Sequence, residues 1–336
     1  MKRATLQLKR KMLATLLLLA ICIACNNGAW AQRTAKMGKH IPVIEQFIRQ
    51  QFAKGAVPPF SFIYDGKPSK NFIRKWNYTA TKLEGQEADV IKYRFTYTDP
   101  NSRLQAECLV TGYPSYDAAE WVLHFTNEGQ TDSPLLKQVK VIDLTMCYPT
   151  QGNFTLHYAE GNHISKADFH PRSLPLALNQ PKEMAPTGGR SSEGDYLPFF
   201  NIESPAGQGV FLSIGWSGTW YADVCQTAAN SVSLASGMKT CELYLHKGES
   251  IRTPSVSLMF WQSNNRIDGH NKFRRLVLAH KTRKINGRIA EYPLSSGFNY
   301  RDPAPCTEYS CLTADYAIAM VKRYIQFGLK PQVFWL

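Results

Sequence analysis

The sequence predicts a mainly β protein, in which a large antiparallel β-sandwich is followed by the start of a parallel strand–helix–strand unit. Two observations predict this fold class. Between residues 58 and 265, many short stretches alternate apolar and polar side chains, and turns rich in Gly, Pro, Asn and Asp separate them. Beyond residue 290, a strand-like stretch, an amphipathic helical stretch and an apolar stretch follow one another.

The sandwich is predicted from period-two patterns. In Ile91–Tyr97, large apolar residues alternate with polar ones, as a half-buried antiparallel strand requires. The same pattern recurs at Trp121, Leu123 and Phe125. Further strand-like stretches are 139–144, 154–158, 209–216, 241–245 and 255–261.

Helical patterns border this region on both sides. Apolar residues at helical spacing within 41–52 predict a packing helix or a linker in an N-terminal segment, 32–57. Residues 266–281 predict a second helix, within a linker that we place at 266–290.

The last region, 291–336, has the pattern of a βαβ unit. It consists of a strand at 292–298, a helix at 313–327 that Gly328 ends, and an apolar strand at 332–336. Parallel sheets are normally covered on both faces, which one such unit does not achieve. We therefore expect a second domain that has only begun and a chain that is truncated within it.

Residues 1–31 have the pattern of a secretory signal peptide. Five Lys and Arg residues precede the short apolar run Leu13–Ala24, and Ala29-Trp30-Ala31 is a small-x-small cleavage site. We expect an exported protein, periplasmic or extracellular, without a stable membrane span. Lipoprotein anchoring through Cys25 is the less favoured alternative.

The charge and the cysteines exclude some classes of function. Residues 1–31 hold five of the 39 Lys and Arg residues and no acidic one, so the formal charge of +13 falls to +8 in the rest of the chain. This excess is dispersed, whereas nucleic-acid binding needs a basic stripe with aromatic residues. Neither a cofactor nor a metal is expected, since Cys306-x4-Cys311 has no second ligand pair. Two disulfides, Cys225–Cys241 and Cys306–Cys311, are candidates whose connectivity stays open.

Five segments occur in an order that resembles a known family. They are Pro186–Ser192, Leu197–Asn201, Ile214–Trp220, His246–Pro254 and Gly269–Arg275. Together they resemble the N-terminal part of bacterial α-galactosidase (melibiase)-like proteins, related to glycoside hydrolase family 36. The resemblance covers roughly residues 58–336.

The resemblance implies a β-supersandwich over 58–265 followed by the truncated start of a (β/α)8 barrel. It also implies a retaining glycoside hydrolase that acts on galactoside-containing glycans through two aspartates on later barrel strands. No residue of this chain matches either aspartate, so the fragment is expected to be inactive. The alternative is a non-catalytic carbohydrate-binding β-sandwich protein. The resemblance leaves room for a homo-oligomer.

Five residues are the candidate substrate contacts. Arg190 offers a planar fork of hydrogen-bond donors in a Thr-Gly-Gly-Arg loop. Trp220 is preferred to Trp216 for stacking on a sugar, because Trp216 follows a strand of alternating apolar residues and is expected in the core. Barrel topology directs Asn299, Glu308 and Trp335 towards a substrate site, although a lone loop carboxylate such as Glu308 is not assigned catalysis.

Overall fold

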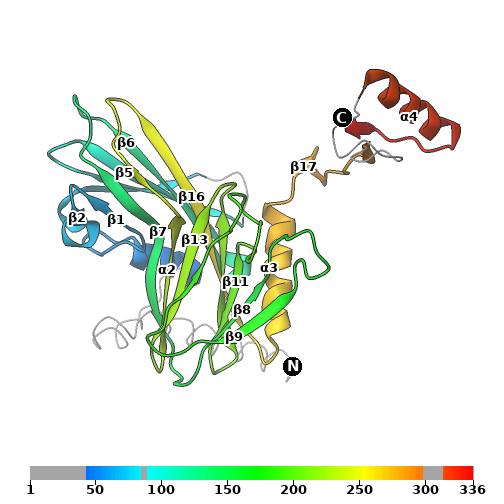
Figure 1. Cartoon of the computed structure of the whole chain (residues 1–336). Helices are drawn as coiled ribbons and strands as arrows, with labels where there is room; N and C mark the ends of the chain where they lie inside the picture. Colours follow the sequence, from blue (N-terminus) through cyan, green and yellow to red (C-terminus); the bar gives the residue numbers. More distant parts are fainter. Residues whose placement is uncertain (1–42, 85–88, 298–312, 336) are drawn as a thin grey trace. The chain divides into compact units, whose positions relative to one another are not determined.

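The computed structural model describes residues 43–84, 89–297 and 313–335. They fall into two compact units, one that extends to Leu276 and one that begins at Val277. The first unit is a sandwich of two antiparallel sheets, drawn as two layers in Figure 1. This confirms the prediction of a mainly β chain with a large antiparallel sandwich.

The larger sheet has nine strands, and neighbours in its order are antiparallel. Their order is β3 (Asn77–Leu83), β4 (Ile91–Thr98), β5 (Leu104–Tyr113), β6 (Ala118–Asn127), β16 (Ser250–Gln262), β12 (Gln208–Gly215), β11 (Phe199–Glu203), β8 (Thr155–Ala159) and β9 (Pro171–Pro175). The predicted strand at 241–245 lies in the other sheet and is only two residues long.

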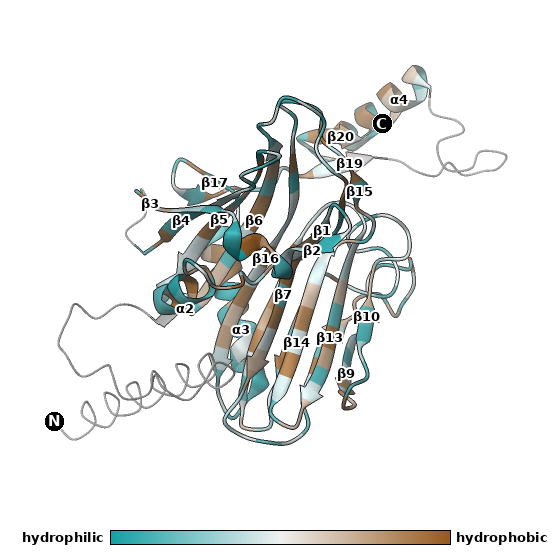
Figure 2. Ribbon diagram, turned by 90° about the vertical axis from the view of Figure 1, so that its left-hand side faces the viewer, coloured by the Kyte–Doolittle hydropathy of each residue, from teal (hydrophilic) through white to brown (hydrophobic). Residues whose placement is uncertain are grey.

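The second sheet has seven strands and is also antiparallel. Its order is β10 (Lys182–Met184), β13 (Trp220–Ala228), β14 (Ser231–Met238), β7 (Leu136–Cys147), β1 (Ser61–Tyr64) and β2 (Lys67–Pro68), with β15 (Glu242–Leu243) on β7. Figure 2 shows hydrophobic and hydrophilic residues alternating along β7, β13 and β14. Short 3₁₀ helices lie between strands at Ser69–Asn71, Ile73–Lys75 and Pro114–Tyr116.

The core lies between the sheets and includes an N-terminal helix, α2 (Val43–Gln51). Phe47 of α2 packs edge-on against Phe260, with 5.3 Å between ring centroids. Phe52, just after α2, stacks on Phe95 at 4.7 Å. The indole of Trp121 joins the two sheets by donating to the Val141 carbonyl at 2.7 Å. The predicted helix at 41–52 is therefore a packing element of the sandwich.

A second helix, α3 (Arg266–His280), begins on the outer face of the nine-stranded sheet. Phe273 stacks on Phe211 of β12, with centroids 5.0 Å apart and planes 3° apart. Lys272 donates to Asp117 at 2.6 Å and to the Phe260 carbonyl at 2.9 Å. The first part of this helix thus covers sheet surface, which a simple linker would not do.

The second unit contains the helix α4 (Ala314–Gln326) between two paired strands, β19 (Ser295–Gly297) and β20 (Val333–Trp335). The strands are parallel, in a register that pairs Ser295 with Val333. A short hairpin, β17 (Lys284–Ile285) and β18 (Arg288–Ile289), precedes them. The predicted strand–helix–strand order is confirmed, and the described part of the chain shows no barrel.

No helix within residues 43–84, 89–297 and 313–335 has the length and apolar character that a bilayer crossing requires.

Candidate functional site

The Thr-Gly-Gly-Arg loop is hydrogen-bonded to Trp220, the first residue of β13. The Trp220 indole donates to the Ser191 carbonyl at 2.8 Å. The loop also closes on itself, because the Thr187 amide donates to Glu193 and the Glu193 amide donates to Arg190, each at 3.2 Å. Trp220 thus contacts the residue that follows Arg190, with Arg190 on the surface and Trp220 buried.

Arg190 forms a two-point ion pair with Glu193 in this loop. Its Nε donates to Oε2 at 2.9 Å and its Nη2 donates to Oε1 at 3.0 Å. The hydrogen bonds from Arg190 hold the pKa of Glu193 below its ordinary value. Glu193 thus occupies one edge of the guanidinium, while the Arg190 side chain as a whole is 82% exposed to solvent. The free edge can still donate to a hydroxyl or an anion.

The two glycines allow the loop to close on itself. Gly189 has a φ of +84°, a conformation that side chains with a Cβ rarely adopt. A Cβ on Gly188 would lie 2.1 Å from Cδ of Glu193, where the ion pair with Arg190 is made. Both glycines are therefore explained by the geometry within the loop.

Of the two tryptophans, only Trp220 differs from its predicted role. Trp220 is 0% exposed and packs edge-on against Phe200 at 5.7 Å. A fully buried indole has no free face on which a sugar could stack, so the prediction for Trp220 is wrong. Trp216 is half-buried and packs against the core, as expected, but keeps part of its surface. Trp220 is buried because it is the first residue of β13 and its side chain faces the interior of the sandwich.

The other three predicted contacts belong to the C-terminal region. Asn299 and Glu308 lie outside the described residues, and so does the second candidate disulfide. Trp335 is the last residue of β20. Their roles as substrate contacts stay predictions.

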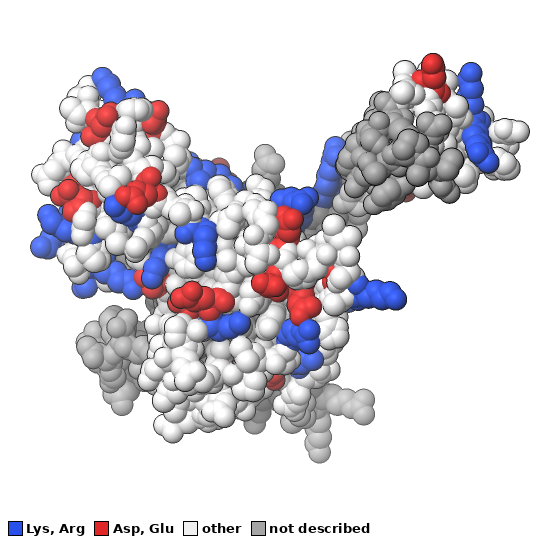
Figure 3. All heavy atoms as spheres, in the orientation of Figure 1, with Lys and Arg blue, Asp and Glu red and all other residues white. Residues whose placement is uncertain are grey.

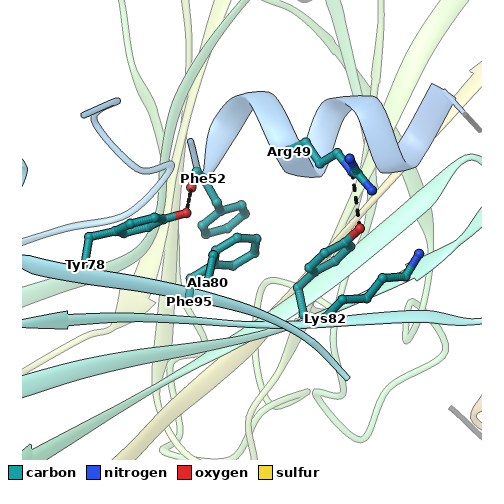
Figure 4. Close-up of a pocket in the computed structure, with 7 residues that line it drawn as sticks. Arg49, Phe52, Tyr78, Ala80, Lys82 and Phe95 are labelled. Carbon is teal, nitrogen blue, oxygen red and sulfur yellow. Dashed lines mark hydrogen bonds between the residues drawn. The ribbon is translucent and has the colours of Figure 1, made fainter. Parts of the chain in front are cut away.

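A pocket that the sequence did not indicate lies between α2 and the edge strand β3. Its volume is about 320 Å³, and it is lined by Arg49, Phe52, Tyr78, Ala80, Lys82, Tyr93 and Phe95 (Figure 4). Two sequence features could have pointed to this pocket. Glu45 and Arg49 are four residues apart on one helix, and apolar and polar residues alternate along β4. Neither signal says that helix and strand meet, which only the tertiary structure decides.

Charged side chains of both signs are interspersed on the sandwich face in Figure 3. Within the described ranges, no three His, Cys, Asp or Glu residues are grouped as metal ligands would be. The thiols of Cys225 and Cys241 are free, so the disulfide proposed between them is not formed. Burial raises the pKa of both thiols.

Comparison with known proteins identifies the fold. No protein-family model matches the sequence, and no curated protein does. Solved structures do match. The GH36 α-galactosidase AgaA from Geobacillus stearothermophilus has 14% identity and a TM-score of 0.54, over 72% of this chain and 35% of that one. The galactosidase domain of the α-galactosidase–sucrose kinase AgaSK has 14% identity and a TM-score of 0.59, over 82% and 38%.

The chain has the fold of part of a GH36 α-galactosidase. The α-galactosidase from Lactobacillus brevis agrees, with 13% identity and a TM-score of 0.56 over 82% of this chain and 37% of that one. The resemblance that the five sequence segments indicated is thus confirmed for the fold. The chain spans a little over a third of the length of these GH36 α-galactosidases and resembles their N-terminal β-domain.

Proposed function

We propose that this chain is the sandwich and the first barrel unit of a retaining glycoside hydrolase that acts on α-galactosides or related glycans. The observation that carries the proposal is the fold match to GH36 α-galactosidases over 72–82% of the chain. The parallel pair β19–β20, joined by α4, supports it, because (β/α)8 barrels are built from such units.

The proposal places the chemistry outside this chain. A retaining glycosidase needs two carboxyl groups about 5 Å apart, one to attack the sugar and one to protonate the leaving oxygen. In the loop at Arg190, the carboxylate of Glu193 is held in an ion pair. The residues that line the pocket beside α2 include no Asp or Glu, and the adjacent Glu45 carboxylate is held by Tyr93, Arg49 and Lys82. We therefore propose that two aspartates on later barrel strands supply catalysis, and that the 336-residue chain alone does not turn over substrate.

The test compares this chain with a version that continues along the genomic reading frame beyond residue 336. We expect hydrolysis of p-nitrophenyl α-galactoside by the longer chain only, with retention at the anomeric carbon by proton NMR. A stop codon directly after Leu336, or a longer chain that cleaves no α-glycoside, would sink the proposal.

The alternative is a carbohydrate-binding sandwich that needs no barrel. The observation that favours it is that the sandwich unit carries a pocket built entirely from its own residues. A glycan array probed with the 336-residue chain separates the two functions. Binding of a defined glycan without any turnover in the longer chain would favour the alternative.

A further inference from the structure

The pocket between α2 and β3 has an open slot because of one small side chain. Tyr78, Ala80 and Lys82 point from β3 towards α2, since alternate residues of a strand share a face. Ala80 leaves room where its two neighbours are long, and it pairs with Phe95 in the next strand. The Tyr78 hydroxyl closes one end by donating to the Phe52 carbonyl at 2.6 Å (Figure 4).

The other end of the slot is cationic. Oε1 of the buried Glu45 accepts from Tyr93 at 2.5 Å, from Arg49 at 2.9 Å and from Lys82 at 3.1 Å. Two cations therefore share one carboxylate, which leaves a formal charge of +1. Both cations also lie over the Tyr93 ring, Arg49 at 6.0 Å and Lys82 at 5.7 Å from its centroid.

The two cations keep donors for a ligand. Arg49 uses Nε towards Tyr93, at 3.2 Å, and Nη2 towards Glu45. Among the residues that the structure describes, no further acceptor is seen for Nη1 of Arg49 or for the other two hydrogens of Lys82. Their side chains are 51% and 53% exposed, so an incoming anion can reach both.

We propose that this pocket binds an acidic monosaccharide, whose carboxylate pairs with Arg49 and Lys82 while its ring enters the slot over Ala80. The charge follows from two cations that share one buried acid. The size follows from a volume of about 320 Å³, at the small end of ligand pockets. The half-buried Tyr78 ring supplies an apolar surface for the C–H face of a sugar.

This site is separate from the proposed catalysis. Its charge and size come from the pocket alone, and only the choice of a sugar rests on the proposed function. The site therefore serves to hold a glycan, not to cleave it.

The experiment titrates D-galacturonate into the 336-residue chain by calorimetry and by saturation-transfer NMR, with D-galactose and inorganic sulfate as comparison probes. We expect saturable galacturonate binding that weakens at high salt, because the charges are partly exposed. Lys82→Gln should weaken it about tenfold, since one charge-assisted hydrogen bond accounts for about one decade in Kd. Ala80→Leu, which fills the slot and leaves the ion pairs in place, should abolish it.

Lys92→Gln is the matched control. Lys92 is an exposed lysine on β4 next to Tyr93, and it points to the opposite face. Its loss should leave galacturonate binding unchanged. Thermal melting of each variant shows that the sandwich is folded.

The proposal would be overturned by no galacturonate binding, by equal binding of sulfate, or by equal binding in the folded Ala80→Leu variant. Galactose binding equal to galacturonate binding would also contradict it, because the cations would then contribute nothing. None of these outcomes depends on α-galactoside hydrolysis, which is measured separately.

Discussion

Trp220 and Ser191 connect the core of the sandwich to the loop that carries Arg190. The Trp220 side chain is fully buried, and its Nε1–H is satisfied by the Ser191 carbonyl. A buried indole of this kind contributes through packing and through one hydrogen bond that would be expensive to leave unmade.

We expect Trp220→Phe to lower the free energy of unfolding by about 2 kcal/mol, from the lost hydrogen bond and the smaller ring. Trp216→Phe, at a half-buried position, should have a smaller effect. Urea unfolding followed by circular dichroism measures both. If Trp220→Phe left the free energy of unfolding unchanged but abolished glycan binding, Trp220 would contact the sugar in spite of its burial in this structure.

The ionisation of Glu45 makes the free energy of unfolding depend on pH. Burial by itself raises the pKa of Glu45, but the hydrogen bonds from Tyr93, Lys82 and Arg49 outweigh burial and hold the pKa below its ordinary value. A pKa that is lower in the folded than in the unfolded chain means that the ionised group stabilises the fold. That contribution is present above the unfolded pKa of about 4.3 and is lost as the pH falls through the folded pKa.

Glu45→Gln should therefore be less stable than the parent chain at pH 7, by about 2 kcal/mol, because Arg49 and Lys82 lose their shared acceptor. The difference should shrink as the pH falls from 5 to 3. Unfolding free energies at four pH values in this range and at pH 7 measure it. A difference that stays constant with pH would show that the Glu45 charge has no part in it.

At the scale of elements, α2 contributes apolar side chains to the core although it precedes the first strand. Ile44, Phe47 and Ile48 of α2, and Phe52 just after it, are each at most 4% exposed. Full burial of such a side chain stabilises a fold by about 1.5–3 kcal/mol. Four of them together contribute about 6 kcal/mol at the lower end, which is comparable with the total stability of many domains.

A chain that starts at Pro58, the sequence-predicted start of the sandwich, should therefore be poorly soluble or melt at a much lower temperature than one that starts at Gln32. Scanning calorimetry and gel filtration of the two chains make the comparison. Equal melting temperatures would show that α2 is dispensable and that the sandwich begins at residue 58.

The helix α4 has apolar side chains on its exposed surface. Ile318 is 52% and Ile325 is 61% exposed, and Phe327 just beyond the helix is 69% exposed. A single strand–helix–strand unit cannot bury both sides of its helix, because parallel sheets are stable when further units cover them. This exposure agrees with the proposal that the unit opens a barrel.

Amide hydrogen exchange tests this proposal. In the 336-residue chain, α4 should exchange much faster than β5 and β6, which lie in the middle of a sheet. In a chain extended by the remaining barrel, exchange in α4 should slow by a large factor while β5 and β6 stay unchanged. Equal protection of α4 in both chains would argue against a barrel built on this unit.

At the scale of the whole molecule, the leader remains a prediction. We propose that residues 1–31 direct export and are removed after Ala31. Mass spectrometry of the mature protein from cell fractions should find Gln32 at the N-terminus, in the periplasm or the medium. A lipid-modified Cys25 at the N-terminus would indicate a tethered lipoprotein, and an intact Met1 would exclude export.

The comparisons define the molecule at the level of its fold. Identities of 13–14% support shared architecture, while function depends on the residues of a site. Substrate and activity therefore rest on the proposals above.

The sequence by itself determined the local elements whose periodicity is strong. The alternation at 91–97 became β4, the apolar stripes became α2 and α4, and the strand–helix–strand order was confirmed. Periodicity reports which side of an element is apolar, and that information is local. Strands such as β13 and β14 were missed because small residues, such as Ala222 and Ser236, occupy some of their inward-facing positions.

Only the tertiary structure decided which sides meet. It buried Trp220 rather than Trp216, left Cys225 and Cys241 unpaired, and placed α2 against β3 and β4 so that Glu45 and Lys82 touch. These contacts join residues that are far apart in sequence, such as the 37 positions between Glu45 and Lys82. They depend on strand order and sheet packing, which follow from the sum of many burial and hydrogen-bond energies and not from any local pattern.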